Sequence, residues 1–101
     1  MKIPEAFTEE SMRKHIFFGI YDGRTRTPNP RVLCLAEWTQ RIPESYKPGA
    51  FRIINEVEDF LFRQAAYIKS DTGFIDAFIH LFKSHINLSI HVGEFTESGW
   101  R

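Results

Sequence analysis

The chain has 101 residues, of which 43% are hydrophobic and 26% are charged, and these proportions indicate one globular domain spanning residues 1–101. Its 13 Lys and Arg residues balance its 13 Asp and Glu residues, so the whole chain lacks the positive field that would attract nucleic acid or an anionic membrane. The single cysteine, Cys34, excludes an internal disulfide and fits a reducing, cytoplasmic location.

The N-terminal part of the chain predicts a helix that begins after Thr8. This residue and the two glutamates behind it suit an N-cap followed by acidic groups at the positive end of the helix dipole. The continuation is ambiguous. Met12, Ile16 and Ile20 recur four residues apart, as in a helix, whereas residues 16–21 are also rich in β-branched and aromatic types and are closed by an Asp-Gly pair, as in a strand before a turn.

Residues 32–36 are open to the same two interpretations. The run Val-Leu-Cys-Leu-Ala suits a buried strand, but Asn29 as a cap, Pro30 at the first helical position and Pro43 as a terminator suit a helix. We favour a β-hairpin made from the two ambiguous runs. A mostly α-helical bundle is the alternative.

Two helices are expected next. In residues 50–68, apolar residues recur every three or four positions, which predicts an amphipathic helix. Residues 70–72 are Ser-Asp-Thr, all good N-cap types, and they separate this helix from a second one. The second helix, from Phe74 to Phe82, is apolar over more than half of its circumference, so it should be buried between other elements.

The period then changes from about four to two. Ile86, Leu88, Ile90 and Val92 alternate with polar residues, which predicts a strand with one apolar face. A strand needs a partner for its backbone, and the predicted hairpin supplies one. The predicted fold is therefore a small α+β domain with an N-terminal helix, a β-hairpin, two consecutive helices and a C-terminal strand that joins the hairpin. Residues 93–101 are expected to form a tail that frays.

The polar stretch between the two ambiguous runs is the first candidate for binding. Arg24, Arg26 and Arg31 lie here without a neighbouring aromatic residue. Guanidinium groups hold phosphates and carboxylates with paired N–H donors, so this loop could contact phosphate, RNA or an acidic protein surface. A solvated loop kept soluble by charge explains the same residues.

Aromatic residues in or beside polar segments are the second candidate. Trp38, Tyr46 and Trp100 are of the types that carry binding energy at protein interfaces, as is arginine. They predict a docking surface together with the loop arginines. Alternatively, Trp38 completes the hydrophobic core.

Catalytic and metal sites are not expected. His80, His85 and His91 are spaced five and six apart. A spacing of five on a helix places two side chains on different faces, and no Cys or Asp triplet completes a metal shell. Asp76 lies one turn before His80, but no nucleophile accompanies this pair. The sequence predicts neither an enzyme nor a cofactor.

These observations favour a small intracellular protein-binding module, such as an inhibitor, an immunity protein or an adaptor, that masks a partner protein. The alternative is an RNA or DNA contact module that uses the loop from Arg24 to Arg31. A third alternative is homodimerisation through an open edge of the strand at residues 86–92. No membrane partner is expected, because no apolar run of eighteen residues is present.

Overall fold

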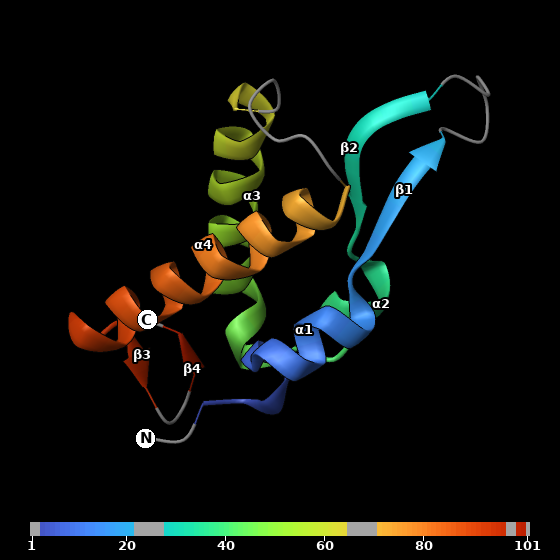
Figure 1. Ribbon diagram of the computed structural model, residues 1–101. Coiled ribbons are helices and arrows are strands. Elements are labelled where there is room, and N and C mark those ends of the chain that lie inside the picture. Colours follow the sequence, from blue (N-terminus) through green and yellow to red (C-terminus); the bar gives the residue numbers. More distant parts are fainter. Residues whose placement is uncertain (1–2, 22–27, 65–70, 97–98, 101) are drawn as a thin grey trace.

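The computed structural model describes residues 3–21, 28–64, 71–96 and 99–100, with side chains at all of these positions except 18–21, 28–32, 71, 95–96 and 99–100. Within these ranges the chain is predominantly helical (Figure 1). The elements in chain order are η1 (Glu5–Phe7), α1 (Glu9–His15), β1 (Phe17–Tyr21), β2 (Pro28–Cys34), α2 (Ala36–Thr39), η2 (Glu44–Tyr46), α3 (Lys47–Arg63), α4 (Asp71–His91), β3 (Phe95–Thr96) and β4 (Gly99–Trp100).

The helix α1 begins as its sequence predicts. The Thr8 side chain accepts a hydrogen bond from the backbone N–H of Ser11 at 3.2 Å, so it caps one of the free donors of the first turn. Acidic residues occupy that first turn and basic residues the last, which complements the helix dipole at both ends. Ile16 then turns the chain into an extended conformation, and β1 follows directly.

The strand β1 lies in the first of the two runs that the sequence left ambiguous. The strand β2 begins earlier than the second run and includes only residues 32–34 of it, since Ala36 begins α2. The two strands pair antiparallel, with Phe17 opposite Cys34 and an irregularity in register between Gly19 and Tyr21. No further strand joins them, since each sheet of the described residues has two strands. The pair extends away from the packed helices (Figure 1).

The predicted α+β fold is wrong, because the C-terminal strand on which it depended does not exist. Residues 86–91 are the last turns of α4, a helix of 21 residues. Ile86 is only 2% exposed, whereas Leu88 and Val92 are 61% and 58% exposed. The alternation of apolar residues therefore belongs to two faces of one helix: Ile86 and Ile90, four apart, pack on the core, while Leu88 and Val92 point away from it. The alternative of a homodimer that pairs through a strand edge at residues 86–92 is therefore wrong as well, because there is no such strand.

A glycine ends α4. Gly93 has a φ of 81°. Glycine adopts this left-handed conformation at little cost in free energy, because it has no Cβ. Its N–H donates to the carbonyl of Ile90 at 3.1 Å, and the N–H of Glu94 donates to the carbonyl of Ser89 at 2.9 Å. These two bonds form a Schellman motif, which fixes the direction in which the chain leaves the helix.

An aromatic cluster forms the centre of the core. Trp38 is fully buried, and its ring meets those of Phe78 and Phe82 edge to face at centroid distances of 6.0 and 5.0 Å. Its indole N–H donates to the carbonyl of Ala6 at 2.8 Å, so the one polar atom of the ring is satisfied. Phe7 packs on Phe82 at 5.6 Å. The N-terminal segment, α2 and α4 are thereby joined around one indole, and the buried second helix expected from the sequence is confirmed.

The short strands β3 and β4 pair with each other, Phe95 opposite Trp100 and Thr96 opposite Gly99. They follow α4, and β4 lies near η2 and α3. Among the described residues, none of the helices combines the length and the apolar character needed to cross a membrane.

Candidate functional site

The arginines proposed from the sequence are mostly beyond what the structure describes. Arg24 and Arg26 lie outside the described residues. The backbone of Arg31 belongs to β2, but its side chain is also outside the description. The proposed contact loop therefore stays a prediction.

The proposed docking aromatics lie in different environments. Trp38 is in the centre of the core, and Tyr46, which is 7% exposed, meets Phe7 edge to face at 6.1 Å. Both rings are packed inside the protein and stabilise its fold, so neither is exposed for contact with a partner protein. Trp100 has its backbone in β4, and its side chain is outside the described set.

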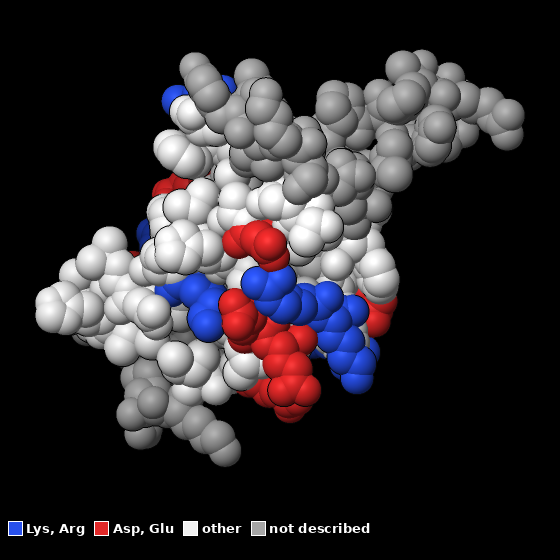
Figure 2. Space-filling view, in the orientation of Figure 1, with Lys and Arg blue, Asp and Glu red and all other residues white. Residues whose placement is uncertain are grey.

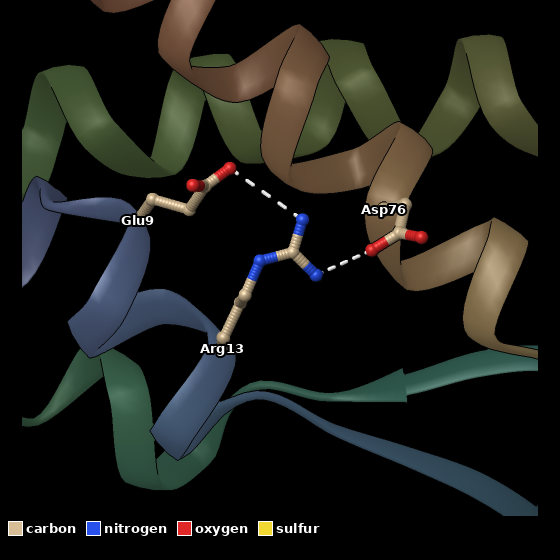
Figure 3. A network of polar contacts seen from close by, with 3 residues as sticks. All are labelled: Glu9, Arg13 and Asp76. Carbon is tan, nitrogen blue, oxygen red and sulfur yellow. Dashed lines mark hydrogen bonds and ion pairs between the residues drawn. The ribbon is translucent and has the colours of Figure 1, made fainter.

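A network of charged groups joins α1 to α4. The Arg13 guanidinium donates to the carboxylate of Asp76 and also contacts that of Glu9 at 3.5 Å (Figure 3). The hydrogen bond from Arg13 to Asp76, followed by the attraction of the two carboxylates, raises the pKa of Arg13. Charged side chains of both signs gather where these helices meet (Figure 2).

This network lines a polar depression of about 480 Å³, together with His80, Lys83, Ser84 and Asn87. Arg13 already contacts two carboxylates. It therefore links α1 to α4 more than it offers a charge for binding an anion. Asp76, which the sequence placed one turn before His80, pairs with Arg13 across the helix contact.

The three histidines of the last third all lie on α4, including His91, which the sequence placed in a strand. His85 is the one with a described ionic partner: its Nδ1 lies 3.7 Å from an Oε atom of Glu56 on α3. Within residues 3–21, 28–64, 71–96 and 99–100, no three His, Cys, Asp or Glu residues are arranged to hold a metal ion.

The most distinctive surface feature is a groove between α3 and α4. It consists of two adjoining depressions of about 390 and 280 Å³ that share Glu56 and His85. We call this feature the α3–α4 groove; its lining residues are Arg52, Ile53, Glu56, Val57, Asp59, Phe60, Arg63, Leu81, His85, Leu88, Ser89, Val92 and Glu94.

Large apolar side chains stand open along this groove. Phe60 on α3 is 51% exposed, and both Leu88 on α4 and Val92 just beyond its end are more exposed still. Buried Ile53 and Val57 close the floor beneath them. Exposed apolar groups that are contiguous and rimmed by polar residues are typical of interaction sites, whereas isolated ones are ordinary.

Ion pairs form the rim of the α3–α4 groove. Asp59 and Arg63 pair one turn apart at one end. At the other end Arg52 meets Glu94 at 3.1 Å, and Glu94 is held in place by the Schellman motif that ends α4. Exposed apolar side chains bordered by a polar rim are a common feature of protein interfaces.

Sequence reasoning missed this groove, although its signal was present. If the helical period of Phe74, Phe78 and Phe82 is continued through Ile86, then Leu88 and Val92 fall on a second, surplus apolar face. Comparison of the chain with protein-family models, with curated proteins and with solved structures finds no match in any of the three. The functional argument therefore depends on the geometry of the groove.

Proposed function

We propose that the protein is a small protein-binding module whose docking face is the α3–α4 groove, and that it acts by covering a helical segment of a partner protein. The observation that carries this proposal is the exposure of Leu88, on the side of α4 that faces away from the core, and of Val92 just beyond the end of that helix. Together with Phe60 they place apolar side chains along a strip between two helices, interrupted by Glu56 and His85.

A helix is the occupant that suits such a strip. Amphipathic helices place apolar side chains at positions i, i+3, i+4 and i+7 into grooves between helices, and all of their backbone groups are already bonded. An extended peptide would gain more from an open strand edge, because its backbone needs hydrogen-bond partners. The groove walls are helices, which offer side chains and no such edge.

The alternative function, contact with RNA or DNA through Arg24, Arg26 and Arg31, draws no support from the described residues. The α3–α4 groove carries three acidic residues, Glu56, Asp59 and Glu94, against two arginines. Such a surface is not attractive to a polyanion.

The test uses two phenylalanines of one helix. Phe60 lines the groove, while Phe51, which is 42% exposed, does not. They are nine residues apart, or two and a half turns, and so lie on opposite faces of α3. Helical peptides are selected from a surface-displayed library with the full chain as bait, and their affinities are measured for wild type, Phe60→Ser and Phe51→Ser.

We expect Phe60→Ser to weaken binding of the selected peptides about tenfold, the loss that follows when roughly half of a phenylalanine is no longer buried by the partner. Phe51→Ser should bind as wild type does. Thermal unfolding of both variants checks that the fold is intact. If no peptide is selected, or if the selected peptides respond to Phe51→Ser and not to Phe60→Ser, the proposed function is wrong.

A further inference from the structure

The charges that line the α3–α4 groove are unevenly compensated. Asp59 has Arg63 as a partner one turn away on the same helix, and Glu94 has Arg52 across the groove. Glu56 differs, because its partner among the described residues is His85 at 3.7 Å. That contact is an ion pair only when the imidazole carries a proton, so with neutral histidine the ion pairs of the described residues supply this carboxylate with no opposite charge.

This carboxylate occupies the middle of the groove. Glu56 and His85 are the two residues that both depressions share. Phe60 lies one turn further along α3 on one side, and Leu88 and Val92 lie on the other. The groove therefore presents an apolar, an acidic and again an apolar section in sequence along its length.

A docked helix would cover Glu56, whose side chain is 57% exposed in the free protein. Removing a carboxylate from water is costly unless an opposite charge replaces the water. A lysine or arginine of the partner supplies that charge, and its aliphatic stem also covers apolar surface on the way to the carboxylate.

We infer that the partner helix carries a lysine or arginine between two apolar anchors, with the cation placed over Glu56 of the α3–α4 groove. On a helix this pattern reads as apolar residues at i and i+7 with a basic residue at i+3 or i+4. The inference rests on the proposed function and goes further, because it specifies the chemistry of the segment that is bound.

The experiment begins with the peptides selected above. The expected result is that they share the central basic residue. One such peptide is then compared with its Lys→Met form on wild type, on Glu56→Gln and on Asp59→Asn. Asp59 is the matched control, since it lies on the same helix and lines the same groove but already has Arg63 as its partner.

We expect Lys→Met to weaken binding to wild type and to Asp59→Asn about tenfold, as a covered charge pair would. The same change should have little effect with Glu56→Gln, because the carboxylate that the lysine met is gone. A Lys→Glu peptide should bind wild type worst and recover affinity with Glu56→Lys. Circular dichroism of each variant shows whether its helices are retained.

Two outcomes separate this inference from the proposed function. If selected peptides depend on Phe60 but show no central basic residue, or if Lys→Met costs the same with Glu56→Gln as with wild type, the inference fails and the groove remains a docking site. If no peptide depends on Phe60, both fail together. If light scattering instead shows a dimer that Phe60→Ser dissociates, the occupant is a second copy of the chain, and the basic partner helix is ruled out.

Discussion

Glu58 illustrates how one partly buried carboxylate affects stability. It lies on α3, and burial raises its pKa above the ordinary value of 4.5. The folded state therefore holds the proton more readily than the unfolded state, and this residue's contribution to stability falls as the pH rises through the raised pKa.

We predict that Glu58→Gln, which keeps the shape and removes the charge, stabilises the protein at pH 7. The gain should be at most about 0.5 kcal/mol, because the side chain is still partly in water, which screens its charge. Below pH 4, where glutamate is protonated in both states, the gain should vanish. Urea unfolding at the two pH values measures this, and Glu58→Asp, which keeps the charge, serves as the control. A gain of equal size at both pH values would contradict the electrostatic explanation.

At the scale of an element, α4 uses its apolar residues for two purposes. Ile86 faces the core, and Leu88 faces the groove. We predict that Ile86→Ala lowers the free energy of unfolding by about 2–4 kcal/mol, since it leaves a cavity in a packed interior. Leu88→Ala should change it by no more than about 0.5 kcal/mol. Chemical denaturation measures the free energy of unfolding of the two variants. Similar decreases for both would mean that the two side chains share one buried face, as they would in a strand.

The helices α1 and α4 show how far the sequence could predict the fold. The N-cap at Thr8 and the buried stripe of Phe74, Phe78 and Phe82 were predictable, because capping and a strong four-residue period are local properties. The helical state of residues 86–91 was not, because a helix with two apolar faces produces the alternation of a strand. Local pattern does not reveal which of the two faces has a neighbour.

The sequence did not predict the α3–α4 groove for the same reason. Exposure of Leu88, and the meeting of Glu56 with His85, depend on how α3 and α4 pack, which is a property of the assembled molecule. The burial of Trp38 is similar. The sequence left open whether this ring lies at a surface or in the core, and its contacts with Phe78, Phe82 and the carbonyl of Ala6, 32 residues away, decide for the core.

At the scale of the whole molecule, stability should be unevenly distributed. The chain measures 43 × 25 × 21 Å, and β1 with β2 extends from the helical body (Figure 1). A two-stranded pair has little stability of its own, and this one also has an irregular register. We predict that the backbone amides of β1 exchange with deuterium well before those of Phe78 and Phe82 in α4. Native-state hydrogen exchange followed by mass spectrometry or NMR tests this, and equal protection would mean that the pair and the helices open as one unit.

The position of Trp38 has a practical consequence. Indole fluorescence shifts to the red when the ring passes from an apolar environment into water, and this indole is enclosed by phenylalanine rings at the point where the N-terminal segment, α2 and α4 converge. With Trp100 replaced by phenylalanine, the emission of the remaining tryptophan would report on the core alone. The chain thus contains an internal optical probe, with which the folding of every variant described above can be followed without a label.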